Sequence, residues 1–449
     1  MERVEFSAKA GNGTERNFFR RGGGGEFEMR KQGTFFALLL ILLFLTACGG
    51  EMIPPPPEEP DVSPAETPET PPEREEEPEK APEDPEEAAL QALLEGMTLE
   101  EKAGQLFFVR VPAENALEDI MTYHLGGYLL FGRDTQDKTA NDLIQTIASW
   151  QAEAVEHDTG VPLLIGVDEE GGSVVRVSSN PHLRSKKFSS PGKLWEEGLD
   201  ALIRETREKA ILLRNLGFNV NLAPVADVST NPSDFIYDRT TGKGAEEAAD
   251  YVSRVMETQS YNNLGSVLKH FPGYGNNRDT HTGVTVDDRP IETFLEQDFL
   301  PFQAGIAVEE TVWPSGELRR LRPAVLVSHN IVSCMDPELP ASLSPEVHRI
   351  LREDLGFDGV VMTDDLAMDA VKAYAADGAV AVMSLQAGND LVVTTDYRTQ
   401  IPRVIQAVKD GALEESVIDA ACLRVLRWKL ELGLLERTEE GTLVSAVLP

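Results

Sequence analysis

Short apolar segments alternate with amphipathic helical segments over most of this chain, and this alternation is the feature that most limits its fold. Eight segments have the length and composition of strands: Gln105–Val109, Gly127–Phe131, Leu163–Val167, Val220–Val225, Ser266–Lys269, Ala324–Ser328, Gly359–Thr363 and Leu391–Thr394. Helical patterns lie between them, as at Ala140–Glu156, Glu246–Asn262, Pro345–Leu355 and Tyr397–Lys409. Strands that are apolar throughout are expected where both faces of a parallel sheet are covered.

Eight strand–helix repeats predict an α/β protein with a (β/α)8 TIM barrel as its single catalytic domain, spanning residues 88–436. The alternative is a doubly wound open sheet. No Gly-rich dinucleotide or phosphate motif follows the early strands, which favours the barrel. Residues 309–323 are predicted to be a surface insertion without an assigned role, and residues 437–449 a C-terminal tail.

The N-terminal region predicts export and anchoring. Residues 1–28 are polar and are interpreted as a non-native upstream extension, with Met29 as the true start. Residues 29–47 form a signal peptide, because the apolar run Phe35–Leu45 follows two basic residues and is too short to span a bilayer comfortably. The sequence Leu45–Gly49 resembles a bacterial lipobox. That resemblance implies cleavage before Cys48, acylation of Cys48, and an extracytoplasmic protein that is lipid-anchored to the cell membrane.

Residues 48–87 combine the lipidated cysteine with a Pro/Glu linker that is expected to be disordered. Residues 51–87 contain 15 acidic residues against Arg74 and Lys80. Such a composition lacks the apolar surface needed to fold, and its like charges repel one another. We interpret it as a spacer.

Charge and cysteine content limit the partners. The net charge is −35, and no Lys/Arg-rich run supplies the basic face that nucleic acid requires. After Cys48 only Cys334 and Cys422 remain, and their spacing is not that of metal ligands, so we expect no metal site. Cys422 is expected in the core; a Cys334–Cys422 disulfide is the less favoured alternative.

Polar residues follow the predicted strands repeatedly. Asp168 follows the third strand, Lys269 and His270 end the fifth, and Asp364 follows the seventh. Because βα loops converge on one face of a barrel, this repetition predicts an enzyme.

Five segments resemble glycoside hydrolase family 3 in its NagZ-like β-N-acetylglucosaminidase branch. They are Val167–Arg176 (VDEEGGSVVR), Asn221–Val228 (NLAPVADV), Lys269–Gly273 (KHFPG), Asp279–His281 (DTH) and Gly359–Leu366 (GVVMTDDL). Each is weak alone, but their order and spacing are specific. Ser173 and Tyr274 depart from residues that are common in this branch, which leaves the aglycone preference open.

The resemblance implies the roles of the site residues. Asp364 matches the nucleophile of a retaining glycosidase, although a helix N-cap is the structural alternative for an Asp in this position. His281 matches the general acid/base, and Asp279 its orienting partner. Residues matching sugar-binding positions are Asp168, Arg176, Arg239, Lys269 and His270.

The predicted function is removal of terminal GlcNAc from peptidoglycan fragments or related β-linked glycans by a monomer that needs no cofactor. Three alternatives remain open: a β-N-acetylglucosaminide phosphorylase, a β-glucosidase, and a non-catalytic wall-binding lipoprotein.

Overall fold

The computed structural model describes residues 84–277, 283–308, 310–312, 318–372, 374 and 379–447. The predicted signal peptide, Cys48 and most of the Pro/Glu linker lie outside the described residues, as do Asp279 and His281.

Eight strands form one parallel sheet within the described residues. They are β1 (Phe107–Arg110), β2 (Gly127–Leu130), β3 (Leu164–Val167), β4 (Val220–Asn221), β5 (Gly265–Phe271), β9 (Ala324–Val327), β11 (Val361–Thr363) and β12 (Val392–Thr394). Their order is β11-β9-β5-β4-β3-β2-β1-β12. A parallel bridge between Met362 and Leu391 joins the two outer strands. The sheet is therefore a nearly closed barrel, which confirms the predicted (β/α)8 architecture and excludes the open doubly wound sheet.

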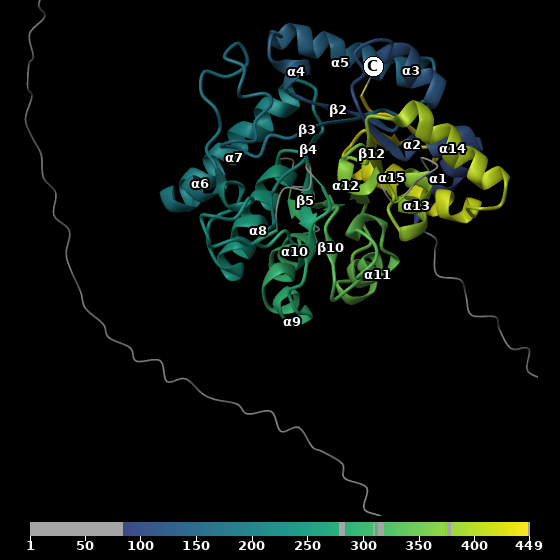
Figure 1. Cartoon of the computed structure of the whole chain (residues 1–449). Coiled ribbons are helices and arrows are strands. Elements are labelled where there is room, and N and C mark those ends of the chain that lie inside the picture. Colours follow the sequence, from purple (N-terminus) through teal and green to yellow (C-terminus); the bar gives the residue numbers. More distant parts are fainter. Residues whose placement is uncertain are drawn as a thin grey trace, which may run out of the picture. The chain divides into compact units, whose positions relative to one another are not determined.

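Helices surround these strands (Figure 1). They are α1 (Pro85–Glu95), α2 (Leu99–Gln105), α3 (Ala116–Tyr123), α4 (Gly132–Thr135), α5 (Ala140–Glu156), α6 (Pro191–Glu197), α7 (Leu199–Asn215), α8 (Ala245–Tyr261), α9 (Ile291–Thr293), α10 (Phe299–Ile306), α11 (Pro345–Arg349), α12 (Asp369–Lys372), α13 (Val380–Ala387), α14 (Tyr397–Lys409) and α15 (Glu415–Glu431). Short 3-10 turns occur at η1 (Tyr237–Arg239) and η4 (Ala341–Leu343), and π-helical turns at η3 (Phe294–Asp298) and η5 (Ile350–Asp354).

The predicted elements correspond closely to the observed ones. Helices α5 and α14 have the predicted bounds, whereas the predicted helix Pro345–Leu355 is divided between α11 and η5. Strand β4 ends at Asn221, earlier than predicted. The reason is Pro224, which lacks the N–H that a continued strand would donate to its neighbour.

Small residues make room for an aromatic side chain inside the barrel. A Cβ placed on Gly166 would lie 2.3 Å from Phe108 Cζ, and one placed on Gly127 would lie 2.9 Å from Phe108 Cδ2. Phe108 is fully buried. It therefore fills the lumen beside β2 and β3, and the positions that follow on these strands lie at the carboxyl-terminal mouth.

The folded region extends beyond both predicted boundaries. Helix α1 begins at Pro85, capped by the Asp84 side chain, and Glu87 pairs with Arg427 of α15 at 2.7 Å. At the other end, β13 (Leu435–Arg437) pairs antiparallel with β14 (Leu443–Ser445). The barrel unit thus includes residues that were assigned to the linker and to the tail, because their backbone and charges find partners on it.

The predicted insertion also has structure. Strands β7 (Glu310–Val312) and β8 (Leu318–Arg320) form an antiparallel hairpin. A second short pair, β6 (Val286–Asp287) and β10 (Ile331–Val332), is parallel.

Charged residues before β9 and β11 share a cavity with the start of α1. Arg322 contacts Asp358 at 2.7 Å and Glu431 at 2.6 Å, and all three line the cavity together with Asp84. Arg322 and Asp358 precede β9 and β11. The described part of the chain therefore begins at the amino-terminal face of the barrel.

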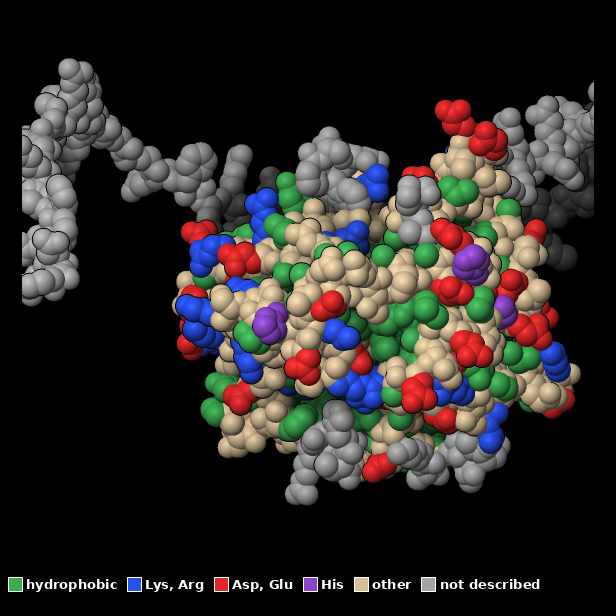
Figure 2. Space-filling model, turned by 90° about the horizontal axis from the view of Figure 1, so that it is seen from above, with side chains coloured by type: hydrophobic (Ala, Val, Ile, Leu, Met, Phe, Trp, Pro, Cys, Tyr) green, Lys and Arg blue, Asp and Glu red, His purple; other side chains and the backbone are tan. Residues whose placement is uncertain are grey.

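None of the described helices combines the length and apolar character needed to cross a bilayer. Cys422 is buried and Cys334 is exposed, both as free thiols, so the alternative disulfide does not form. On the face seen in Figure 2, acidic and basic side chains are interspersed, without one continuous basic area.

Candidate active site

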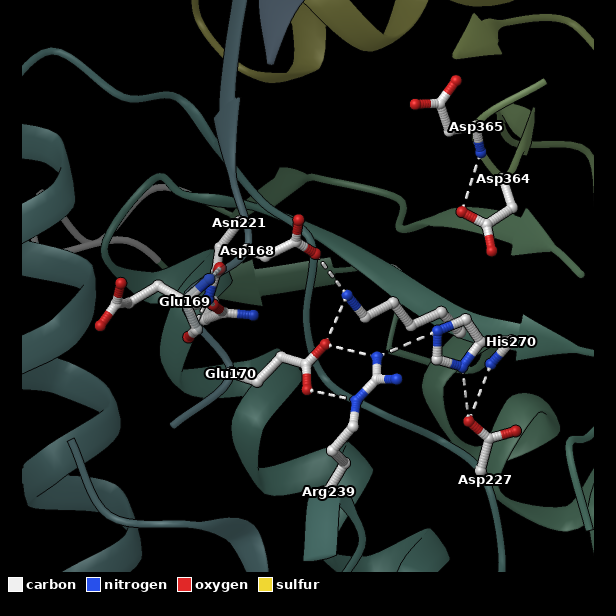
Figure 3. Close-up of polar contacts among 11 residues, drawn as sticks. Asp168, Glu169, Glu170, Asn221, Asp227, Arg239, His270, Asp364 and Asp365 are labelled. Carbon is white, nitrogen blue, oxygen red and sulfur yellow. Dashed lines mark hydrogen bonds and ion pairs between the residues drawn. The ribbon is translucent and has the colours of Figure 1, made fainter. Parts of the chain in front are cut away.

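Asp168, Arg239 and His270 lie close together at the carboxyl-terminal mouth of the barrel (Figure 3), and Lys269 joins them through its contact with Asp168. Asp168 follows β3, Lys269 and His270 belong to β5, and Arg239 ends the turn η1 in the segment between β4 and α8. Asp364 follows β11. These residues are far apart in the sequence, but the order of the strands in the sheet places the strand ends that carry them at one end of the barrel.

Glu170 connects these residues, although the sequence had not marked it as a site residue. Lys269 Nζ lies 2.6 Å from Asp168 Oδ1 and 2.7 Å from Glu170 Oε1. Arg239 donates from Nε and Nη2 to the two carboxylate oxygens of Glu170, at 3.0 and 2.8 Å. One signal could have revealed it, since Glu170 lies two positions after Asp168, an alternation that places both on one side of an extended chain.

The buried charges of this cluster stabilise one another. Burial alone would raise the pKa of Glu170, but the charges of Lys269 and Arg239 outweigh it and hold that pKa far below its usual value. Burial alone would lower the pKa of Lys269, but Asp168 and Glu170 raise it. Glu170, Lys269 and Arg239 are therefore ionised at neutral pH, which fixes their donors and acceptors in place.

Asp227 sets the tautomer of His270. The Asp227 carboxylate is fully buried, and its Oδ2 lies 2.7 Å from His270 Nδ1. Because a carboxylate can only accept, Nδ1 carries the proton and Nε2 is left as an acceptor for Arg239 Nη2 at 3.1 Å. In this arrangement His270 accepts from Arg239.

Glu169 orders the loop that carries Arg176. The buried Glu169 carboxylate accepts from the backbone N–H groups of Arg176 and Val177 at 2.8 and 2.7 Å. Within the described residues, the Arg176 guanidinium has neither a hydrogen bond nor an ion pair. The loop is thus held by its backbone, and the Arg176 side chain remains half-buried.

Asp364 and Asp365 have different surroundings. The Asp364 N–H donates to Val327 O at 3.1 Å, which continues the β11–β9 ladder, and Asp364 Oδ1 accepts from the Asp365 N–H at 2.8 Å. Asp365 accepts from the Ala367 N–H at 2.9 Å, two residues further along, which closes a turn. Neither of these two contacts caps α12, which begins only at Asp369.

His329 fixes the turn that follows β11. Its Nε2 donates to the Asp365 carbonyl at 3.1 Å, and its Nδ1 lies 2.7 Å from Ser342 Oγ. His329 is fully buried. The direction of the Asp364–Asp365 turn is therefore set by a side chain from the neighbouring strand.

The predicted acid/base pair, Asp279 and His281, lies outside the described residues, but the base of its loop is described. Asn277 Nδ2 donates to Asp287 Oδ2 at 2.8 Å. Arg289 Nε in turn donates to Asp287 Oδ1 at 3.0 Å. These contacts hold together the two ends of the segment that contains the predicted pair.

Comparison with known proteins identifies the family of this chain. The glycosyl hydrolase family 3 N-terminal domain matches residues 98–428, which is most of the chain. The chain belongs to glycosyl hydrolase family 3. It is therefore a glycoside hydrolase, and the fold and the motif order agree with that assignment.

Relatives within the family are hexosaminidases. The chain is 31% identical over 355 residues to beta-hexosaminidase LpqI of Mycobacterium tuberculosis, covering 76% of this chain and 84% of that protein. It is 31% identical over 275 residues to the beta-hexosaminidase of Bordetella pertussis, covering 60% and 72%. A solved family 3 beta-N-acetylglucosaminidase from Paenibacillus sp. matches with a TM-score of 0.67 and 27% identity, over 78% of this chain and 66% of that one.

Among the residues that the structure describes, no group of three or more His, Cys, Asp or Glu side chains is arranged to hold a metal ion.

Proposed function

We propose that this family 3 hydrolase is a retaining β-N-acetylglucosaminidase that removes terminal GlcNAc from peptidoglycan fragments. The observation that carries the proposal is the cluster of contacts among Asp168, Glu170, Lys269 and Arg239 at the same barrel mouth as Asp364. The names of the relatives support GlcNAc as the sugar.

In the proposed reaction, Asp364 attacks the anomeric carbon and forms a covalent glycosyl-enzyme while the bond to the leaving oxygen breaks. His281, oriented by Asp279, gives its proton to that oxygen. The same imidazole then takes a proton from water, whose oxygen attacks the anomeric carbon and releases Asp364. Two inversions give net retention of configuration.

The ion-paired cluster would hold the sugar during both steps. Asp168 keeps one carboxylate oxygen beyond its contact with Lys269, and this oxygen can accept from a sugar hydroxyl. Arg239 uses Nε and Nη2 on protein partners, which leaves Nη1 to donate to the substrate. A rigid set of charged donors and acceptors favours binding of a polar sugar, because a buried donor or acceptor that lacks a hydrogen-bond partner weakens binding.

The test is turnover of an aryl β-GlcNAc glycoside by the wild-type protein and by Asp364→Asn. We expect kcat to fall by about four orders of magnitude in the variant, the scale on which loss of a catalytic carboxylate acts. Asp410→Asn, which changes an exposed carboxylate on α14's C-terminal side, serves as the control and should keep full activity. Equal rates for wild type and Asp364→Asn would refute the assignment.

Product analysis separates the alternatives. Initial release of the β-anomer of free GlcNAc is expected from a retaining hydrolase. Phosphate-dependent release of a sugar 1-phosphate would identify a phosphorylase, and preference for an aryl β-glucoside would identify a β-glucosidase. Saturable binding without turnover would indicate a wall-binding protein.

We further propose that the enzyme works outside the cell membrane, attached through an acylated Cys48. The lipobox-like sequence and the apolar run before it support this proposal. Expression of the full chain with a radiolabelled fatty acid should label the wild type in the membrane fraction. Cys48→Ser should carry no label, and equal labelling of the two proteins would exclude acylation at this cysteine.

A further inference from the structure

Arg289, two residues after β6, is a cation near the active site that the proposed mechanism does not use. It is shared by two buried carboxylates, since the side chain of Asp287 is 0% exposed and that of Asp298 is 1% exposed. Arg289 Nη2 lies 2.8 Å from Asp287 Oδ2, and its Nη1 lies 3.0 Å from Asp298 Oδ2. Its Cζ also lies 4.5 Å from the centroid of the Phe294 ring. We call Asp287, Arg289 and Asp298 the Arg289 cluster; its contacts hold the guanidinium in one orientation.

The turn that follows β5 packs directly on this cluster. Gly273 and Gly275 have positive φ angles, of 131° and 54°. A Cβ placed on Gly275 would lie 2.3 Å from Arg289 Cζ, and a Cβ placed on Gly273 would lie 2.3 Å from Asp298 Oδ1. Only glycine allows so close an approach with this backbone conformation. The Arg289–Asp298 pair therefore determines the path of the backbone through residues 273–275.

This turn connects two parts of the active site. On its amino-terminal side, the Gly273 N–H donates to the carbonyl of His270, which belongs to the sugar-binding cluster, at 2.9 Å. On its carboxyl-terminal side, Asn277 is 6% exposed, and its Nδ2 donates to Asp287 Oδ2 at 2.8 Å. Asn277 directly precedes the segment 278–282, which contains the predicted acid/base pair, and Asp287 lies beyond that segment in β6. The Arg289 cluster thus contacts the chain on both sides of it.

Stability alone does not explain why two buried carboxylates share one guanidinium here. Burial raises the pKa of Asp298 to about 7, although Arg289 opposes this shift. Replacing buried ionic groups by well-packed apolar residues is often neutral or stabilising, so such groups are expected where they select one conformation. The planar fork of an arginine has fixed donor directions, which suits it to orienting a backbone turn.

We propose that Arg289 is a positioning residue for general acid catalysis. In this proposal the Arg289 cluster holds the turn at residues 273–277, and through this turn it sets the position from which His281 protonates the leaving oxygen. The inference rests on the proposed GlcNAc hydrolysis. It adds to that reaction a residue that touches neither the substrate nor the reacting atoms.

The experiment compares two aryl β-GlcNAc glycosides that differ in their need for a proton. Dinitrophenolate leaves without protonation, whereas 4-methylphenolate leaves efficiently only when a general acid protonates it. We expect Arg289→Lys to lower kcat/KM on the methylphenyl glycoside by about tenfold, part of the roughly 10²–10⁴ that general acid catalysis contributes. On the dinitrophenyl glycoside it should stay within about twofold of the wild type. Lysine keeps the charge and so protects the fold, but its single ammonium cannot replace the planar fork.

Three further variants test the cause of this selectivity. His281→Ala should show the same selectivity with a larger loss, because it removes the acid itself. Gly275→Ala keeps every charge but places a Cβ against Arg289, so it should also lose rate selectively on the methylphenyl glycoside. Gly160→Ala is its matched control, since Gly160 has a positive φ of 77° and a Cβ there would meet nothing within 4 Å. It should keep both wild-type rates.

Arg254→Lys is the matched control for Arg289→Lys. Arg254 is 40% exposed and pairs with Asp250 on α8, so its replacement should leave both rates unchanged. Loss of rate to the same extent on both glycosides in Arg289→Lys, or no loss on either, would overturn the positioning role while the hydrolase assignment stands. A selective loss in His281→Ala that is absent from Arg289→Lys would overturn it as well.

Hydrogen–deuterium exchange measured by mass spectrometry tests the turn even without turnover. The N–H groups of Gly273 and Asn277 donate to backbone carbonyls at 2.9 and 3.2 Å. Peptides covering residues 270–277 should exchange about fivefold faster in Arg289→Lys than in the wild type or Arg254→Lys, the scale of one lost hydrogen bond. Faster exchange with no turnover by the wild type would support the contact of the cluster with the turn and refute the proposed hydrolysis. Unchanged exchange would overturn the positioning role.

Discussion

Glu170→Gln should destabilise the protein much more than a change of one carboxylate oxygen suggests. The Glu170 side chain is 1% exposed and contacts two cations, Lys269 at 3% and Arg239 at 14% exposure. An amide keeps the shape but removes the charge that balances them. Breaking one partner out of a buried pair typically costs 3–5 kcal/mol, and because Asp168 still faces Lys269 we expect a loss near the lower end, about 3 kcal/mol.

The melting temperature measures this loss. The entropy of unfolding is about 2.1 cal/mol/K per residue, so for a folded unit that spans residues 84–447 a loss of 1 kcal/mol lowers the melting temperature by about 1.3 °C. A decrease of about 4 °C is therefore expected by calorimetry at pH 7. Glu257→Gln is the control, because Glu257 is 54% exposed and, among the residues that the structure describes, pairs only with Arg254 on the surface of α8. Its melting temperature should stay within about 1 °C of the wild type.

The pH dependence provides an independent check. The folded-state pKa of Glu170 is depressed, so its charge contributes stability that is fully present above the unfolded-state pKa of about 4.3. That contribution is lost as the pH falls through the folded-state pKa. The difference in melting temperature between wild type and Glu170→Gln should therefore be constant from pH 6 to 8 and shrink below about pH 4. A difference that is absent at pH 7, or that grows on acidification, would refute the ion-pair argument.

Two further changes test the site and the barrel interior. Asp227→Asn should lower kcat/KM by about tenfold, because it weakens the hydrogen bond that fixes the His270 tautomer. Long-range proton–nitrogen NMR should show a smaller population of the Nδ1–H tautomer in the variant, and a spectrum like that of the wild type would contradict this reasoning. Gly166→Ala should destabilise the fold by about 1–3 kcal/mol in urea denaturation, since its Cβ would meet Phe108 Cζ at 2.3 Å. Gly96→Ala, where the nearest atom would be 3.4 Å away, should unfold at the wild-type urea concentration.

The fold was predictable because each strand is covered on both faces and is therefore apolar throughout. The last residue of a strand was harder to predict where one residue ends the strand, as Pro224 does after β4. The π-helical turn η5 after α11 could not be distinguished from an α-helix in the sequence, because its apolar residues still lie on the side that faces the barrel.

The site was predictable only in part. Asp168 and Asp364 follow apolar strands directly, and Lys269 lies near the end of one, so their common position at the mouth could be expected. Glu170 could not be recognised in the same way, because its partner Arg239 is 69 positions away and only the barrel brings them together.

The cavity that contains Asp84, Arg322 and Asp358 has a consequence for how the enzyme would be presented. The first described residue sits at the end of the barrel that is opposite to Asp364, since Arg322 and Asp358 precede the strands whose far ends carry the site. The start of α1 therefore lies away from the substrate entrance, so a glycan that reaches Asp364 does so without passing this helix.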